Sequence, residues 1–323
     1  MTPAAASVIF HVPDRYHALL AKPDRPMIYH IIRDLVVSRG GRVMLAPPDI
    51  ARDAQGRALP DGDLHIVNNG AAVGPGYLNA ATAYLADYWH LDPQGVQANS
   101  SIGGKAFDAT AIDPIAAASH LKALRARFVL PRRSRYRQAA KRADLPPGGI
   151  AVFLQGPAPY ARGQAHLRPE AMLRAVCAGA GGRAVWVKPH PLKPEEGLAL
   201  IARLRTQGLP LTQVDANVHD LLASACATVS VNSAAAIEGL MHGTPAILLG
   251  KSDFHFVAET VTRPEEFAPA LDRALARPRD YAAFLYWYFH DQCLWLGDRA
   301  LADRIWTIFA AAGFPPARLG LLD

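Results

Sequence analysis

Two kinds of side chain that can hold a phosphate group follow a short apolar run in the second half of the sequence. The segment Lys188-Pro189-His190-Pro191 comes directly after the apolar run Ala184 to Val187. Two prolines stiffen this segment, so the imidazole and the ammonium group are held in place. His190 and Lys188 are therefore candidates to donate hydrogen bonds to phosphate oxygens and to stabilise the charge of a departing nucleotide. The alternatives are an ordinary loop histidine and a solvated lysine.

A second segment joins an apolar run directly to a helical pattern. Ser233 follows Asn232 and is suited to cap a helix, and the small residues after it leave the first backbone N–H groups uncovered. Such a helix start binds anions, which makes Asn232 and Ser233 candidate contacts of a nucleotide. Glu238 falls in the second turn, where a carboxylate can accept hydrogen bonds from ribose hydroxyls. A capped helix without a ligand would explain the same residues.

A glutamine follows the apolar run Ile150 to Leu154. Gln155 stands before Gly156-Pro157, so it either points into a cleft or belongs to a plain turn. The carboxyl ends of parallel strands meet at one edge of a sheet, and ligands bind there. We therefore expect Gln155, His190 and Ser233 to lie around one nucleotide.

Candidates for acid–base chemistry lie in the first half, in Trp89-His90-Leu91-Asp92-Pro93-Gln94-Gly95-Val96. His90 and Asp92 can take part in proton transfer; the alternative is that they end a strand at a Pro-Gly turn. Asp61-Gly62-Asp63 is similar to a metal-binding Asp-x-Asp, but it stands in a Pro- and Gly-containing loop, which favours a turn. No other segment has metal-ligand spacing, so we expect neither a metal nor another cofactor.

Length and composition set the broad class of the protein. A chain of 323 residues favours two domains. Half of the residues are hydrophobic and 19% are charged, which excludes wholesale disorder. The three cysteines are far apart, as expected of buried thiols. There is no apolar run of eighteen residues and no secretory signal pattern, so we expect a cytoplasmic protein.

The formal net charge is +6, and the densest basic stretch runs from Arg132 to Arg142. We interpret 132–142 as a solvated loop and helix face. The alternative is a peripheral contact with the inner membrane surface or with a polyanionic acceptor. Aromatic residues are too sparse in this stretch to favour binding of nucleic acid.

Apolar runs alternate with helical patterns along most of the chain, which predicts parallel sheets covered by helices. A linker is expected at Asp144 to Gly149, where prolines and glycines cluster. The fold class we predict is α/β, with two facing Rossmann-like domains and C-terminal helices. The predicted parts are a first Rossmann-like domain (1–145), a second one (146–277), and helices that pack back across the domains (278–323). The predicted strands of the first domain are Ser7 to Val12, Val43 to Ala46 and Leu64 to Val67.

Three of these motifs together resemble the capsule polysaccharide synthesis family, whose best-understood members are β-Kdo transferases that use CMP-Kdo. The resemblance covers roughly Ile150 to Thr260 and implies a GT-B architecture. It further implies that His190 and Ser233 contact the donor phosphate and that Glu238 helps to hold the nucleoside. The segments that carry it are Phe153-Leu154-Gln155, Val187-Lys188-Pro189-His190-Pro191, Val229-Ser230-Val231-Asn232-Ser233 and Glu238 to Pro245.

The resemblance predicts a metal-independent glycosyltransferase that moves Kdo or a related sugar from a CMP-linked donor to a surface glycan or glycolipid. One alternative is a CDP-glycerol-type glycerophosphotransferase, against which stands Val231-Asn232-Ser233-Ala234 where such enzymes have an Asp-Tyr-Ser-Ser type segment. Another is a non-catalytic glycan- or nucleotide-binding partner in polysaccharide assembly. That alternative is favoured by a departure around Asp92, because the arginine expected after Gly95 is absent.

Overall fold

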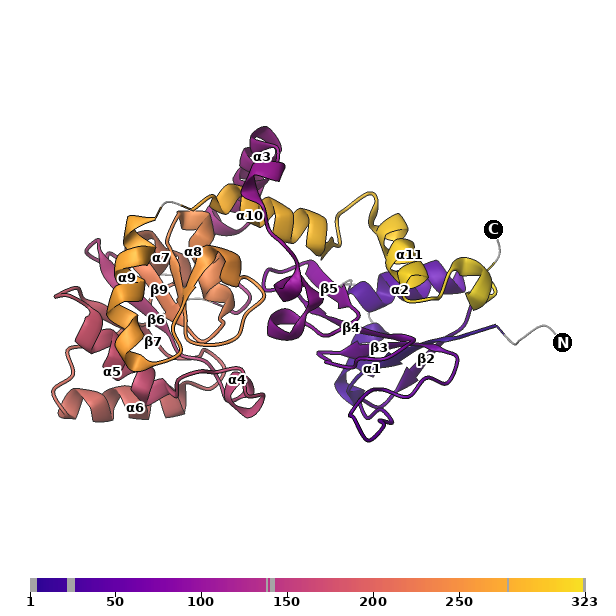
Figure 1. The fold of residues 1–323 in the computed structure, drawn as a ribbon, viewed down its shortest axis with the longest axis horizontal. Coiled ribbons are helices and arrows are strands. Elements are labelled where there is room, and N and C mark those ends of the chain that lie inside the picture. Colours follow the sequence, from indigo (N-terminus) through magenta and orange to yellow (C-terminus); the bar gives the residue numbers. More distant parts are fainter. Residues whose placement is uncertain (1–4, 22–26, 138, 140–142, 278, 322–323) are drawn as a thin grey trace. The chain divides into compact units, whose positions relative to one another are not determined.

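The chain folds into two compact units, each of which contains one six-stranded sheet. The computed structural model describes residues 5–21, 27–137, 139, 143–277 and 279–321 (Figure 1). Unit 1 comprises residues 1–105 and 289–323, and unit 2 comprises 106–288. Residues 106–145, which the sequence grouped with the first domain, therefore fall in unit 2. The predicted tail is divided, because 278–288 fall in unit 2 and 289–323 in unit 1.

The sheet of unit 1 is mixed. Its strand order is β12-β5-β4-β3-β1-β2. The strands β1 to β4 are parallel, whereas β5 is antiparallel both to β4 and to β12. All three strands predicted for this part of the chain are present. The bounds are β1 (Val8–His11), β2 (Val43–Ala46), β3 (Leu64–Asn68), β4 (Tyr77–Thr82), β5 (Tyr88–Asp92) and β12 (Leu294–Trp295).

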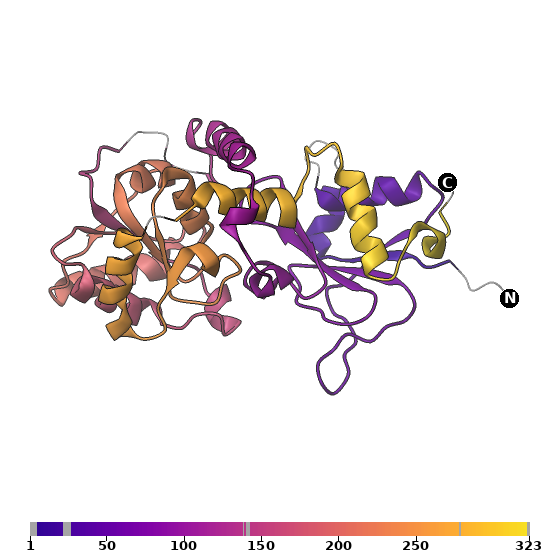
Figure 2. The same ribbon diagram turned by 45° about the horizontal axis from the view of Figure 1, so that its top comes forward.

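One core holds the helices of unit 1 to its sheet. Ile28, Ile32 and Val36 recur at helical spacing along α2, so their side chains form one buried face. They pack with Phe10 of β1 and Phe309 of α11. Figures 1 and 2 show α2 and α11 on the same side of the sheet. The helix bounds are α1 (Asp14–Leu20), α2 (Ile28–Val37) and α11 (Leu301–Ala311).

The sheet of unit 2 is parallel throughout. Its order, β11-β10-β9-β6-β7-β8, is the arrangement of a dinucleotide-binding domain, in which the chain changes direction of winding between β6 and β9. Ligands of such sheets bind beyond the carboxyl ends of the strands at that switch point. The bounds are β6 (Gly149–Phe153), β7 (Val185–Lys188), β8 (Thr212–Gln213), β9 (Ala225–Ser230), β10 (Ala246–Leu248) and β11 (Ala258–Thr260).

Helices cover both faces of this sheet, as the apolar runs of its strands require. One core contains side chains of α5, α6 and α9, and a second contains side chains of α7 together with Ala235 of α8. The helix bounds are α4 (Ala158–Ala161), α5 (Pro169–Gly179), α6 (Pro194–Thr206), α7 (Val218–Ser224), α8 (Ala234–His242) and α9 (Phe267–Ala276).

Residues 106–137 join unit 2 through aromatic packing. Helix α3 (Pro114–Leu124) packs against α10 (Tyr281–Tyr286), and the Phe107 ring meets those of Phe284 and Trp287. A π-helical turn at Arg125–Val129 then leads the chain towards the sheet, and the Arg125 side chain donates to the carbonyl of Met241 in α8. Within the described residues, none of the helices has the length and apolarity needed to cross a membrane.

Candidate functional site

Gln155 and Asn232 meet at the switch point of the unit 2 sheet. Gln155 Nε2 donates to Asn232 Oδ1 at 2.9 Å, and the Asn232 backbone N–H donates to Gln155 Oε1 at 2.9 Å. Asn232 Nδ2 also donates to the carbonyl of Lys251 at 3.0 Å. Two residues that the sequence offered as separate ligand contacts thus bind each other. They fix the loops after β6, β9 and β10 in one arrangement.

Ser233 caps α8, as its sequence predicts. Its Oγ accepts a hydrogen bond from the Ala235 N–H at 3.2 Å, and its own N–H donates to Ser230 Oγ at 3.2 Å. The helix therefore begins at the end of β9, beside the switch point. Its first amides carry the partial positive charge of a helix start, which favours an anion there.

His190 keeps one ring nitrogen available as a donor. The backbone N–H of Leu192 donates to His190 Nδ1 at 3.3 Å, so the proton of the neutral ring is assigned to Nε2. Burial lowers the pKa of His190, and the positive charges of Arg135 and Lys193 lower it further. At pH 7 the ring is therefore neutral, with an Nε2–H that can bind a phosphate oxygen.

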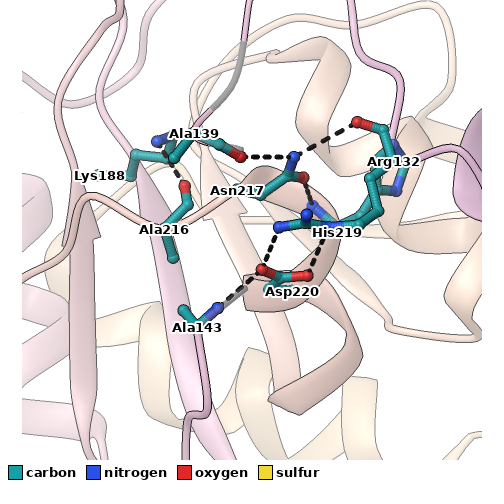
Figure 3. Close-up of polar contacts among 8 residues, drawn as sticks. All are labelled: Arg132, Ala139, Ala143, Lys188, Ala216, Asn217, His219 and Asp220. Atoms are coloured by element: carbon teal, nitrogen blue, oxygen red, sulfur yellow. Dashed lines mark hydrogen bonds and ion pairs between the residues drawn. The ribbon is translucent and has the colours of Figure 1, made fainter. Parts of the chain in front are cut away.

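Lys188 ends β7 and holds the neighbouring loop. Its Nζ donates to the carbonyl of Ala216 at 2.7 Å (Figure 3). The same Nζ lies 3.9 Å from Asp215 Oδ1. Burial lowers the pKa of this ammonium group. The contact ties β7 to the start of α7, and a direct role of Lys188 at a phosphate stays a prediction.

Glu238 is enclosed within unit 2 rather than directed at solvent. Its side chain is 1% exposed and accepts hydrogen bonds from the Ser134 hydroxyl and the Arg135 backbone N–H. Burial raises the pKa of Glu238 to about 7. In this structure the carboxyl group holds the segment that contains Ser134, and its predicted contact with ribose stays a prediction.

The basic segment, residues 131–137, lies at this same part of unit 2, which the sequence did not reveal. The Arg132 guanidinium pairs with the carboxylate of Asp220, at 2.9 Å from Nε to Oδ1 (Figure 3). Asn217 Nδ2 donates to the carbonyl of Arg132 at 3.4 Å, and His219 Nε2 lies 2.9 Å from the carbonyl of Arg133. The backbone of the segment is thus fastened to the start of α7, while Arg133, Arg135 and Arg137 are exposed, as expected of a solvated loop. The remainder of the predicted stretch, 138 and 140–142, lies outside the described residues.

In unit 1, Asp92 is occupied by its own loop. Its carboxylate accepts hydrogen bonds from the backbone N–H groups of Gln94 (2.8 Å), Gly95 (3.1 Å) and Ser101 (2.9 Å), and from Ser101 Oγ (2.6 Å). Asp92 pairs with Asn79 of β4, which is in register with Val67 of β3 and through it with His11 of β1, so Asp92 is level with the carboxyl ends of β1 and β3. His90, two residues earlier, is 1% exposed and meets the edge of the Tyr84 ring. The catalytic role predicted for His90 and Asp92 stays a prediction.

A cavity of about 430 Å³ adjoins Asp92 within unit 1. Its size is that of a small-molecule site. Lys105 Nζ donates to Gln292 Oε1 at 2.6 Å at its margin. Its apolar wall is formed by Leu78, Leu91, Ile102, Leu294 and Ile308. Its polar groups come from Lys105, Asp291, Gln292 and Arg304.

The Asp61-Gly62-Asp63 carboxylates are used by the chain itself. Asp61 Oδ1 lies 2.8 Å from His65 Nε2, and Asp63 Oδ1 accepts the Ser7 N–H at 2.6 Å. Gly62 has a φ of +100°, a conformation that suits glycine in a tight bend. Over the part of the chain that is described, no three His, Cys, Asp or Glu side chains are grouped to hold a metal ion.

Comparison with known proteins supports the resemblance seen in the sequence. Residues 163–292 match the model of a family described as "Capsule polysaccharide biosynthesis protein". No curated protein sequence matches the chain. The resemblance to the capsule polysaccharide synthesis family is thus confirmed for residues 163–292, of which 163–288 belong to unit 2 and 289–292 to unit 1.

Two solved structures from Thermosulfurimonas dismutans have a similar fold. The KpsC β-Kdo 2,4 transferase aligns with 85% of this chain and 88% of its own, at a TM-score of 0.53 and 15% identity. The KpsC β-Kdo 2,7 transferase aligns with 95% of this chain and 99% of its own, at a TM-score of 0.52 and 12% identity. The two α/β units and these alignments confirm the predicted GT-B-like fold class.

Proposed function

Starting from the resemblance to the capsule polysaccharide synthesis family, we propose that the chain is a glycosyltransferase of surface polysaccharide synthesis. It transfers Kdo or a related sugar from a CMP-linked donor to a glycan or glycolipid acceptor. The single observation that carries the proposal lies at the carboxyl edge of the unit 2 sheet. There the Nε2–H of His190 is available to an anion at the end of β7, and the start of α8 brings its partial positive charge to the end of β9; β7 and β9 are the two neighbours of β6.

The proposed chemistry at this edge is stabilisation of the leaving nucleotide. When the bond between the sugar and the phosphate breaks, negative charge grows on a phosphate oxygen. The neutral His190 ring can donate its Nε2–H to that oxygen, and the partial positive charge at the start of α8 can stabilise the same negative charge. Donors fixed before the reaction need no rearrangement as the charge develops. We therefore propose a reaction that uses these groups and requires no metal ion.

We place the acceptor on unit 1. Support comes from the cavity of about 430 Å³, which combines apolar wall with the charged groups Lys105, Asp291 and Arg304. Asp92 lines this cavity. Its carboxylate accepts hydrogen bonds from four donors of its own loop and so holds that loop in place. We propose that His90 and Asp92 act as acid–base residues. Loss of turnover without loss of stability in Asp92→Ala would separate that role from a structural one.

The proposal is tested by thermal unfolding in the presence of CMP, CDP, UDP and GDP. A ligand that binds only the folded chain stabilises it by about 2.7 kcal/mol at a hundred times its Kd. We expect CMP to raise the melting temperature more than UDP or GDP. Equal shifts for all four nucleotides, or none, would contradict a cytidine-nucleotide site.

Turnover separates the enzyme from a non-catalytic binding partner. An enzyme releases CMP from CMP-Kdo in the presence of acceptor, whereas a binding partner retains the nucleotide without turnover. The engagement of Asp92 by its own loop is the observation that favours a partner. A preference for CDP-glycerol over CMP-Kdo in the same assay would favour a glycerophosphotransferase.

A further inference from the structure

The arginines of the basic segment differ in how their charges are balanced. Arg132 is paired with Asp220, and both side chains are nearly buried, at 15% and 10% exposed. Arg135 and Arg137 are exposed, and neither forms an ion pair with any described residue. Two guanidinium groups that have no carboxylate partner among the described residues are thus found at positions i and i+2 of one segment.

These two arginines line a cavity of about 340 Å³. Arg133, Tyr136 and Asn217 line it as well. The volume is within the range of small-molecule sites, and its lining is polar and basic. A hollow of this kind fits a small anionic ligand better than a flat lipid surface, because several arginines line one space.

The backbone of the segment is fixed by contacts on two helices. Asn217, the N-cap of α7, donates to the carbonyls of Arg132 (3.4 Å) and Ala139 (3.3 Å), as Figure 3 shows. Glu238 of α8 accepts from the Ser134 hydroxyl and the Arg135 N–H. Arg132 itself adopts a φ of +56°, which is uncommon outside glycine and persists only where surrounding contacts hold it. The positions of the arginine backbones are therefore set by the fold.

The cavity adjoins the proposed phosphate site. The ring of Tyr136, which lines the cavity, meets the ring of His190 at 5.6 Å between centroids. The positive charge of Arg135 lowers the pKa of His190 by electrostatic repulsion. A ligand with a phosphate at His190 can therefore reach the guanidinium groups with another part, or with another oxygen of the same phosphate.

The acidic groups packed against the segment do not cancel this charge. Asp220 is engaged by Arg132 and by the backbone N–H of Ala143 at 3.0 Å. Asp215 is 94% exposed and lies 3.9 Å from Lys188. Glu238 is buried and bound to the segment's own donors. The region therefore keeps a positive potential that favours an oxyanion.

We propose that Arg135 and Arg137 bind an oxyanion of a small ligand, in a site formed by the basic segment and the start of α7. The basic segment is then part of the donor site of unit 2 instead of a contact with the membrane. The inference rests on the proposed function only for the identity of the ligand as a cytidine nucleotide. Guanidinium groups bind phosphate through paired hydrogen bonds, which gives the site both affinity and direction.

The test is calorimetric titration of the full chain with CMP, cytidine and inorganic phosphate. We would compare the wild type with Arg135→Gln, Arg137→Gln and the double variant. Each substitution removes hydrogen bonds to a charged group, and we expect the loss of that binding free energy to weaken CMP binding by about tenfold. Cytidine, which has no phosphate, should bind the variants as it binds the wild type.

Matched controls separate the site from general loss of charge. Arg205→Gln removes an equal charge from the exposed end of α6 and should leave CMP binding unchanged. The charge-preserving double variant Arg135→Lys/Arg137→Lys should recover part of the affinity but lose the paired geometry. Melting temperatures of all variants should equal that of the wild type, because both arginines are exposed.

The outcomes distinguish this inference from the proposed function. If the double glutamine variant binds CMP as the wild type does, the inference is overturned while the nucleotide site at His190 stands. If wild-type binding of phosphate depends on the two arginines but CMP has no advantage over UDP or GDP, the oxyanion site stands and the cytidine function fails. If neither CMP nor phosphate binds, and anionic phosphatidylglycerol vesicles alone respond to the arginines, the inference is overturned in favour of a membrane contact.

Discussion

Asp92 is the last residue of β5 in unit 1, His190 follows β7 in unit 2, and both have side chains suited to catalysis. The chain saturates Asp92 with four donors from its own loop, whereas it uses only Nδ1 of His190. Both side chains lie near the carboxyl ends of parallel strands: β7 leads directly to His190, and Asp92 is level, through Asn79 and Val67, with the end of β3.

The comparison teaches that residue type and position after a strand do not by themselves identify a site. What distinguishes the two positions is the hydrogen-bonding capacity that remains after the fold has used its share. A residue whose acceptors are filled supports the loop around it, and a residue with an available donor can bind a ligand.

The largest expected effect is that of removing the Asp92 carboxylate. Asp92→Ala leaves three backbone N–H groups without their acceptor in a buried loop. We expect the free energy of unfolding of unit 1 to fall by about 4 kcal/mol. Calorimetry of the variant, with the exposed Asp49→Asn in the same unit as control, measures this change. Unchanged stability with lost turnover would instead make Asp92 a catalytic residue.

A second prediction compares Asp92 with Glu238, a buried carboxyl group with fewer donors. Folding raises the pKa of Glu238 from 4.5 to about 7, so the unfolded chain ionises this group at lower pH than the folded chain does. The free energy of unfolding therefore falls as the pH rises above 4.5. This cost grows between pH 4.5 and about 7 and is constant above that range. The difference in pKa corresponds to about 3 kcal/mol, so Glu238→Gln should be more stable than the wild type by up to that amount at pH 8.

Chemical denaturation at pH 4.5 and pH 8 measures the Glu238 effect. Near pH 4.5 the two proteins should be nearly equal, because the wild-type carboxyl group is largely neutral there in the folded state. Glu265→Gln, at a side chain that is 68% exposed, is the control and should show no such dependence on pH. A variant that is equally stable with the wild type at both pH values would mean that Glu238 is not held in a destabilising environment.

The third prediction concerns the donor that the fold leaves available. His190→Ala should lower turnover by about tenfold, or about 1.4 kcal/mol of transition-state stabilisation, with the melting temperature unchanged. His190→Gln keeps an N–H at the end of the side chain and should retain more activity. Steady-state release of CMP from the donor measures both, and an unchanged rate in the alanine variant would remove His190 from the site.

The smallest expected effect is at the helix cap. Ser233→Ala should cost about 1 kcal/mol of stability and also weaken binding of CMP. Ser233→Asp separates the two effects, because aspartate keeps the cap but repels a phosphate. We expect the aspartate variant to melt with the wild type while binding CMP less well. Equal binding by all three proteins would exclude the start of α8 as the phosphate site.

Local sequence was enough to predict the α/β class, many of the strands and the cap of α8. The apolar runs Ser7 to Val12 and Val43 to Ala46 contain β1 and β2, and Ser233 caps the helix that follows it. These features depend on propensity, hydrophobic pattern and capping chemistry, which act over a few residues. The Lys188-to-Pro191 motif could likewise be assigned to the end of a strand, because β7 ends at Lys188.

Which polar groups are available to a ligand depends on contacts between segments that are distant in the sequence. The pairing of Gln155 with Asn232, the ion pair of Arg132 with Asp220 and the burial of Glu238 all join residues far apart in the sequence. No local pattern encodes such contacts, since they arise when the strand order brings distant loops to one edge. The residue types and their local spacing therefore identify the chemical groups that the chain contains. The packing around the sheets determines which of those groups are hydrogen-bonded within the fold and which remain available to a ligand.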